Sequence, residues 1–208
     1  MLMKNCWLLR PMPHGNNRMK VFLEKEIIAI GYPVGKTFQG LSYDEIRATL
    51  GKWAEGLGNV NIFVNIMKIG DIVIVPDDNK RDVYIGSIDG EYQHDIDLES
   101  EGYPHLRNVS WLFDKKPLFR NSLPDGIKNS MRYPGTLADL TKHIDTIENL
   151  ITSEGTELMP STTTTISSVE TEAIEVLKDL LQSEKEEIRL KAAEVILSQI
   201  SSGRLKFM

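Results

Sequence analysis

Cysteine is nearly absent from this chain of 208 residues, which contains only Cys6. A single thiol excludes an internal disulfide framework and a cysteine-based zinc cluster. No apolar run approaches the roughly 18 residues that a membrane-spanning helix needs. The first apolar stretch follows a single lysine, is too short for the core of a signal peptide, and is better read as a strand. We therefore expect a cytoplasmic protein that does not enter a membrane.

Recognisable catalytic motifs are also lacking. The sequence contains no Walker loop, no HExxH zinc motif and no Ser-His-Asp order. The acidic turn at residues 77–82 has basic residues in its middle and lacks the ordered loop of a calcium site. The acidic run at residues 93–101 lacks the Asp/Glu-x-Lys element of a metal-dependent nuclease. We expect no catalytic residue, no enzyme activity, no metal site and no cofactor.

The charge of the chain is unevenly distributed. Its formal net charge of −6 argues against a broad electrostatic attraction to nucleic acid. Residues 1–151 carry 18 Lys and Arg against 20 Asp and Glu, so most of the excess acidity lies in residues 152–208. The first part is close to neutral and can present a local basic face. Any binding of nucleic acid should therefore depend on a specific pocket and not on long-range electrostatic attraction.

Apolar periodicity divides residues 1–151 into short strands and helices. The predicted strands are residues 6–10, 27–31, 72–75, 83–88, 91–96 and 106–113. The predicted helices are residues 17–26, 42–50, 59–69, 124–131 and 137–151. Ser42 and Glu45 have the spacing of a capping box, which marks the start of the second helix. This mixture predicts an α+β fold.

The last quarter of the chain has a different composition. Residues 152–168 are rich in Ser and Thr without apolar periodicity, which predicts a flexible linker. Residues 169–182 and 184–200 have the apolar stripes of two amphipathic helices, and together predict a helical hairpin at 169–200. A lone hairpin cannot bury its own stripes well. We therefore expect the hairpin to mediate homodimer formation or to dock a partner.

Four segments carry a resemblance to a known family. They are IIAIGYP (27–33), KIGDIVIVP (68–76), GYPHLRNVSW (102–111) and NSMRYPGTLADLTKHIDTIENLI (129–151). In order and spacing they resemble the N-terminal reader domains of modification-dependent restriction systems, which belong to the PUA-like superfamily with the EVE and YTH domains. The resemblance covers residues 5–151, so residues 1–151 are identified as a PUA-like reader domain.

The resemblance implies a small, partly closed mixed β-barrel flanked by helices, with an aromatic cage that accepts a flipped, modified base. It implies a nucleic-acid partner, with DNA favoured over RNA, in a restriction or defence system. An effector nuclease or another protein would act after recognition. The family usually has Trp directly after IAIG, where this chain has Tyr32, which can still stack on a base.

Aromatic, amide and basic residues near the strand ends are the candidate site. The candidate residues of the base pocket are Trp7, Asn16, Tyr32 and Trp111. The candidate contacts to the nucleic-acid backbone are Arg18, His105 and Arg107. Aromatic rings stack on bases, amides match base edges, and guanidinium groups bind phosphate. The alternative is that the rings fill the core and the basic residues lie on solvated faces. Trp53 we interpret as a surface or packing residue.

Two other functions are consistent with the same pattern. The chain could be an assembly protein whose pocket is degenerate and whose tail recruits an effector. It could also be a sensor of a small molecule such as a nucleotide, using the same cavity. A basic rim around the pocket would favour the nucleic-acid reader over the sensor, and a filled cavity would favour the assembly protein over both.

Overall fold

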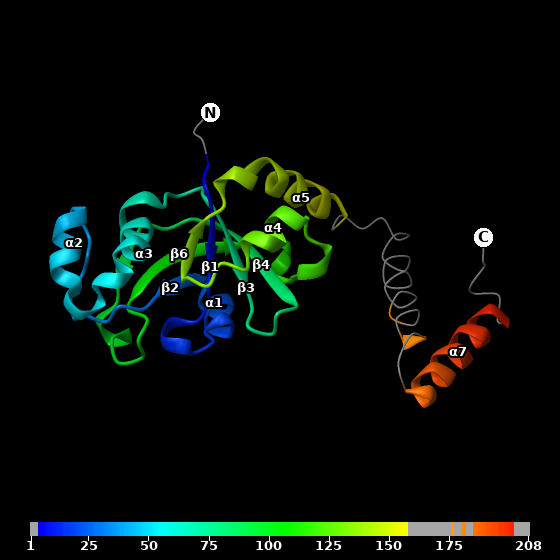
Figure 1. Cartoon of the computed structure of the whole chain (residues 1–208). Coiled ribbons are helices and arrows are strands. Elements are labelled where there is room, and N and C mark those ends of the chain that lie inside the picture. Colours follow the sequence, from blue (N-terminus) through cyan, green and yellow to red (C-terminus); the bar gives the residue numbers. More distant parts are fainter. Residues whose placement is uncertain (1–3, 158–175, 177–179, 182–184, 202–208) are drawn as a thin grey trace. The chain divides into compact units, whose positions relative to one another are not determined.

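The structure is a computed structural model that describes residues 4–157, 176, 180–181 and 185–201. The chain divides into two units, Met1–Gly155 and Thr156–Met208, which we describe separately. The first unit has a mixed α+β fold in which a curled eight-stranded sheet forms a half-barrel flanked by helices (Figure 1). No helix within the described ranges combines the length and apolar character needed to cross a membrane.

The sheet has the strand order β2-β6-β4-β3-β1-β8, with β5 added beside β6 and β7 beside β4. Its strands are β1 (Cys6–Leu9), β2 (Ile27–Ile30), β3 (Ile72–Pro76), β4 (Asp82–Ile88), β5 (Gln93–His94), β6 (His105–Trp111), β7 (Leu118–Phe119) and β8 (Leu137–Asp139). Strands β1 and β3 are parallel, with Cys6 opposite Ile72, and the other pairs are antiparallel. The predicted strands at the start of the chain and around the 77–82 turn are confirmed.

Helices cover both faces of the sheet. The helices of the first unit are α1 (Met19–Lys25), α2 (Tyr43–Leu50), α3 (Leu57–Asn61), α4 (Asp125–Ser130) and α5 (Ile144–Glu157). Short 3₁₀ helices are η1 (Pro13–Gly15), η2 (Gly51–Gly56), η4 (Ile96–Leu98), η5 (Phe113–Lys115), η6 (Arg120–Ser122) and η7 (Thr141–His143), and η3 (Ile62–Ile66) is a π-helix. The capping box at α2 is confirmed, since Ser42 Oγ accepts from the Glu45 N–H and the Glu45 carboxylate accepts from the Ser42 N–H.

The apolar runs of β1 and β3 are continuous because both of their faces are buried. Trp7 and Leu9 belong to the cluster that packs under α1, α2 and α3. Cys6 and Leu8 belong to a second cluster, with residues of α4 and α5. Side chains alternate across a strand, so a strand between two helical layers needs apolar residues at every position.

The structure differs most from the predicted elements in four places. The predicted strand 91–96 is reduced to β5 (Gln93–His94), and Ile96 begins the 3₁₀ turn η4. The predicted helix 59–69 ends at Ile66, and its second half is the π-helix η3. The predicted helix 137–151 begins with strand β8, because Leu137–Asp139 pairs with β1 at the end of the sheet. The predicted linker at 152–168 is helical to Glu157 as part of α5, and the rest of it lies outside the described residues. Strand β8 was not predicted because three residues are too few to show an alternation of apolar and polar positions.

The described part of the second unit contains α7 (Glu186–Ser201), which matches the predicted helix 184–200. The predicted helix 169–182 lies outside the described residues except for three positions, and so does the hairpin turn. Val176, Leu180 and Leu190 are exposed within the described residues. The homodimer stays a prediction.

Candidate functional site

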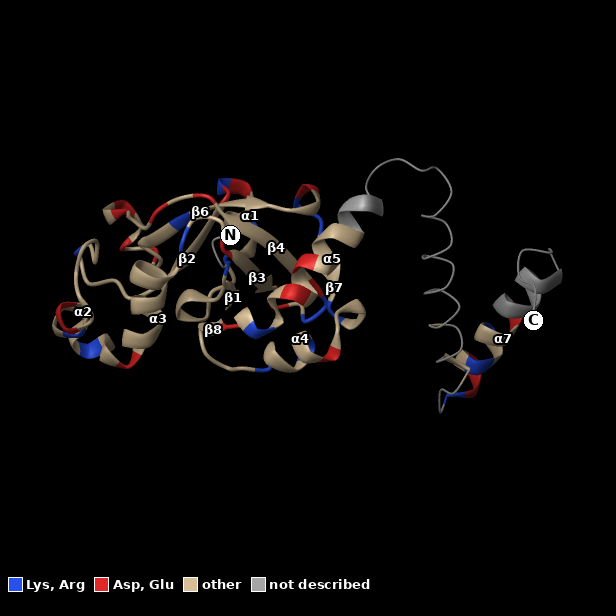
Figure 2. Cartoon of the chain, turned by 90° about the horizontal axis from the view of Figure 1, so that it is seen from above, with Lys and Arg blue, Asp and Glu red and all other residues tan. Residues whose placement is uncertain are grey.

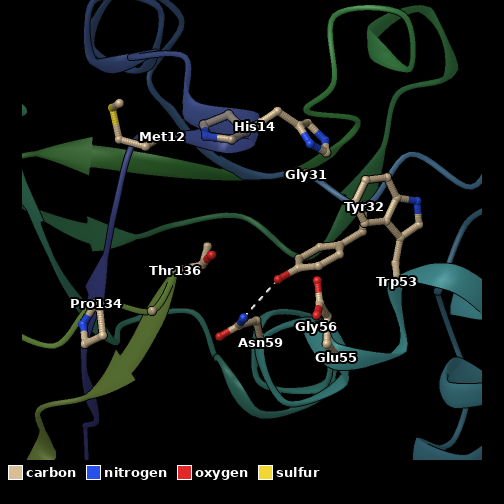
Figure 3. A pocket seen from close by; sticks show the side chains of 12 residues that line it. Met12, His14, Gly31, Tyr32, Trp53, Glu55, Gly56, Asn59, Pro134 and Thr136 are labelled. Carbon is tan, nitrogen blue, oxygen red and sulfur yellow. Dashed lines mark hydrogen bonds between the residues drawn. The ribbon is translucent and has the colours of Figure 1, made fainter.

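A cavity of about 420 Å³ opens where four chain segments meet, at residues 12–14, 31–32, 53–59 and 134–136 (Figure 3). The first segment follows β1, the second follows β2, the third spans η2 and α3, and the fourth precedes β8. Three aromatic rings line this cavity, those of His14, Tyr32 and Trp53. We call it the aromatic cavity.

Tyr32 is the central ring of the aromatic cavity. Its backbone φ is +68°, a left-handed conformation that non-glycine residues rarely adopt. The phenolic oxygen accepts a hydrogen bond from Asn59 Nδ2 at 2.9 Å (Figure 3), which leaves the phenolic proton free to donate. A Cβ at Gly56 would overlap the Tyr32 ring, so only glycine at this position leaves room for it. Backbone strain of this kind, of order 1–3 kcal/mol, gathers at binding sites.

His105 supports the backbone of Tyr32 through a hydrogen bond. Its Nε2 lies 3.0 Å from the Tyr32 carbonyl oxygen, and its Nδ1 lies 2.7 Å from the Tyr92 hydroxyl oxygen. The Tyr92 hydroxyl already accepts from the Phe38 N–H and therefore donates to Nδ1. These partners select the neutral tautomer with its proton on Nε2. Burial lowers the pKa of His105 to about 4, so the ring is neutral at pH 7.

The rings of Trp53 and His14 lie beside each other in the lining of the aromatic cavity. Their ring centroids are 5.2 Å apart, and the Trp53 ring meets the Tyr32 ring edge to face at 6.4 Å. The His14 ring lies against Gly31, where an added Cβ would come within 2.9 Å of His14 Nε2. His14 also has a positive φ of 52°. Trp53 packs against the main core cluster, as predicted, and its ring also lines the cavity, a placement that the sequence did not indicate.

The polar lining carries one formal charge. Glu55 supplies a carboxylate, Asn59 an amide and Thr136 a hydroxyl, and none of the lining residues is Lys or Arg. The cavity is therefore suited to a neutral or cationic planar group with hydrogen-bonding edges, and unsuited to a phosphate. Within the described ranges, no group of three or more His, Cys, Asp or Glu side chains could hold a metal ion.

The structure corrects the placement of two predicted cage residues. Trp7 is 3% exposed, and its indole N–H donates to Asp71 Oδ2 at 2.8 Å inside the core. The Trp111 indole N–H donates to the Phe22 carbonyl oxygen at 3.1 Å. Neither ring lines the aromatic cavity. Trp7 lies on a strand that is covered on both faces, which leaves its ring no open side.

Two predicted backbone contacts are also corrected. Arg107 is 1% exposed and His105 is fully buried, so neither can reach a phosphate. The Arg107 guanidinium donates to the carbonyl oxygens of Phe63, Val64 and Gly90. It thereby satisfies two carbonyls of the π-helix η3, the segment where the predicted regular helix changes its pitch.

Arg18 and Asn16 lie closer to the surface but outside the cavity lining. Arg18 is bonded to the carbonyl oxygen and the carboxylate of Glu101, and its guanidinium carbon lies 4.7 Å from the centre of the Tyr103 ring. Its charge is thus already compensated. Asn16 is exposed, and its backbone N–H caps the turn that presents His14 to the cavity. Of the seven predicted site residues, only Tyr32 lines the cavity.

Comparison with known proteins gives one family and no named relative. Neither the curated proteins nor the solved structures contain a match to this chain. A family model described as a domain of unknown function, DUF8426, matches residues 9–132. The matched span includes three of the four segments that line the aromatic cavity and covers more than half of the chain. The chain therefore belongs to the DUF8426 family.

Proposed function

We propose that the first unit is a non-catalytic nucleic-acid reader of the PUA-like type, which takes one flipped, modified base into the aromatic cavity. The observation that carries this proposal is the set of three rings, His14, Tyr32 and Trp53, around a cavity without Lys or Arg. Stacking on one aromatic ring contributes about 1–3 kcal/mol per base. Two such contacts offset the few kcal/mol that extruding a base costs.

The polar groups of the cavity would supply recognition of the base edge. The Asn59 side chain, the Thr136 hydroxyl and the Glu55 carboxylate approach the cavity from two of its segments. The Tyr32 hydroxyl, held by Asn59, can donate to a base acceptor. Its backbone is held by His105, so the ring is positioned before the ligand arrives. Such preorganisation lowers the entropy cost of binding.

The sensor of a small molecule is the second candidate. The cavity, at about 420 Å³, falls in the size range of roughly 300–1,000 Å³ that is common for small-molecule sites. A free nucleoside would use the same rings as a flipped base. An assembly protein with a degenerate pocket has less support, because the cavity is open. A role in a restriction or defence system, a preference for DNA and an effector partner stay predictions from the family resemblance.

The test is a titration of the full chain with short single-stranded DNA and RNA oligonucleotides whose central base is unmodified or methylated, and with the corresponding free nucleosides. We expect one oligonucleotide to be preferred. Tyr32→Ala and Trp53→Ala should each weaken its binding about 5- to 150-fold, the equivalent of 1–3 kcal/mol of stacking. Tyr43→Ala is the matched control, because Tyr43 is an exposed tyrosine on α2 outside the cavity.

Binding that is equal for all central bases, or that is unchanged in both cavity variants, would refute the reader. Binding of a free nucleoside as tight as that of the oligonucleotide would favour the sensor.

A further inference from the structure

A second cavity, of about 330 Å³, lies beside the first and is rich in positive charge. Four cationic residues line it, namely Arg10, Lys80, Arg120 and Arg132. We call it the basic cavity. Two carboxylates, Asp77 and Asp78, also line it, so its formal charge is +2 in a chain with a net charge of −6.

The topology of the sheet explains why these cations meet. Strands β1 and β3 run parallel, so both of their carboxyl ends lie at one edge of the sheet. Arg10 follows β1, and Lys80 lies in the turn that follows β3. Arg120 follows β7, which pairs with the start of β4 at the same turn. Arg132 follows α4. Figure 2 shows Lys and Arg interspersed with Asp and Glu over the first unit. A local cluster of four cations therefore differs from the mixed charge of the rest of this surface.

The charge of the four cations is offset only in part, by the two carboxylates of the lining. Among the described residues, none of them forms an ion pair with a carboxylate. The Arg10 guanidinium is held by neutral acceptors, the carbonyl oxygens of Met131 and Tyr133, at 2.7–3.1 Å. It is thus fixed in place while it keeps its charge.

One of the two carboxylates of the lining, that of Asp77, is held by hydrogen bonds from its own neighbourhood. Asp77 Oδ1 accepts from Asn17 Nδ2 and from the Asp78 N–H, each at 2.7 Å. Asp77 Oδ2 accepts from Asn79 Nδ2 at 3.3 Å. These bonds hold the Asp77 carboxylate within its own turn, where it keeps its charge but forms no ion pair with any of the four cations, so the cavity retains its formal charge of +2.

The basic cavity is continuous with the aromatic cavity along the chain. Residues 10–12 line the basic cavity and residues 12–14 the aromatic cavity, with Met12 in both. In the same way, residues 131–132 line the basic cavity and residues 134–136 the aromatic cavity. The same two segments therefore join the cavities, because they carry Arg10 and Arg132 in the basic cavity and His14 in the aromatic cavity.

We propose that the basic cavity binds the phosphodiester backbone of the strand whose base enters the aromatic cavity, an inference that rests on the proposed reader function. Guanidinium groups bind phosphate through paired hydrogen bonds and stay charged at any physiological pH. A flipped base remains attached to its backbone, so a reader needs phosphate contacts next to its base pocket. These four residues take the role that the sequence assigned to Arg18, His105 and Arg107.

The test compares the double variant Arg120→Gln/Arg132→Gln with the control Arg47→Gln/Lys25→Gln in the full chain. Both control residues are exposed and line neither cavity. Arg10 is left intact, because its side chain also supports two carbonyls. The probes are the oligonucleotide preferred by the wild type and the same oligonucleotide with an abasic site at its centre, titrated between about 50 and 200 mM salt.

We expect the double variant to weaken both probes by the same factor. Each phosphate contact on a single strand contributes about 0.7 to the slope of log affinity against log salt, so loss of two contacts should lower that slope by about 1.4. Tyr32→Ala should instead weaken only the probe that has a base.

The outcomes separate the two proposals. A double variant that matches its control in affinity and slope overturns the basic cavity as the phosphate site, while base preference in the wild type still supports the reader. A lower slope in the double variant than in its control, without any base preference in the wild type, supports the phosphate site and overturns the reader. Absence of binding to either probe overturns both.

Discussion

His105 makes the stability of the first unit depend on pH in a way that can be calculated. Its pKa is lowered to about 4 in the fold, mainly by burial, with a smaller contribution of the same sign from His94 and an opposing one from the bond to the Tyr32 carbonyl. The unfolded chain, with the ordinary pKa of about 6.5, binds the proton more tightly than the fold does. Stability is therefore complete above pH 6.5 and is lost as the pH falls from 6.5 toward 4.

The magnitude follows from the size of the shift. Each pKa unit is equivalent to about 1.4 kcal/mol, so His105 should cost the fold about 2 kcal/mol between pH 7 and pH 5, and about 3 kcal/mol at still lower pH. Urea unfolding of the wild type and of His105→Gln at both pH values isolates this contribution, because all other titrating groups are shared. Should Gln at 105 prevent folding, the His105 ring can be titrated directly by NMR in the wild type.

The prediction has a clear refutation. An equal loss of stability in both proteins between pH 7 and pH 5, or a His105 ring that protonates near pH 6.5, would show that the ring is not buried as described. The position of Tyr32 would then lack its support.

Four further predictions test the fold and the site. Arg107→Ala should destabilise the first unit by more than about 3 kcal/mol in urea unfolding, since three charge-assisted hydrogen bonds are lost. Its effect should not be limited to the salt dependence of oligonucleotide binding. Ile74→Ala should cost about 2–5 kcal/mol in the same assay, because its side chain is 1% exposed, and a loss below about 1 kcal/mol would contradict its place in the core. Gly56→Ala should keep the fold by circular dichroism but lose oligonucleotide binding, since the new methyl group displaces the Tyr32 ring, and unchanged affinity would count against the aromatic cavity. The tail should form a homodimer, so sedimentation of the full chain should give a dimer and a chain ending at Glu157 a monomer; two monomers would exclude that role.

Local rules account for the parts of the fold that the sequence predicts correctly. Strands β1, β2, β3 and β4 are short apolar runs bounded by turn residues, a pattern that depends only on neighbours in the chain. The capping box of Ser42 and Glu45 is local in the same sense. The α+β class follows from the mixture of such segments.

The burial of polar residues needed the tertiary structure. Arg107 and His105 stand in a strand with alternating exposure signals, and nothing in the sequence shows that η3 would offer carbonyls to one and Tyr32 a carbonyl to the other. Sequence reasoning assumes that a charged side chain points to solvent, because burying it without partners is costly. Here the Phe63 carbonyl lies 44 positions from Arg107 and the Tyr32 carbonyl 73 positions from His105.

The candidate site is the part that depends most on tertiary contacts. An aromatic residue before a proline at the end of a strand was enough to single out Tyr32. The one hint for Trp53 was a tryptophan in a glycine-rich segment, which is equally typical of a surface loop. The sequence by itself determined strands β1 to β4 and helix α2, because hydrophobic period and capping act between near neighbours. Only the tertiary structure decided which rings and which cations face each other, because each cavity is lined by segments that the curled sheet brings together from distant parts of the chain.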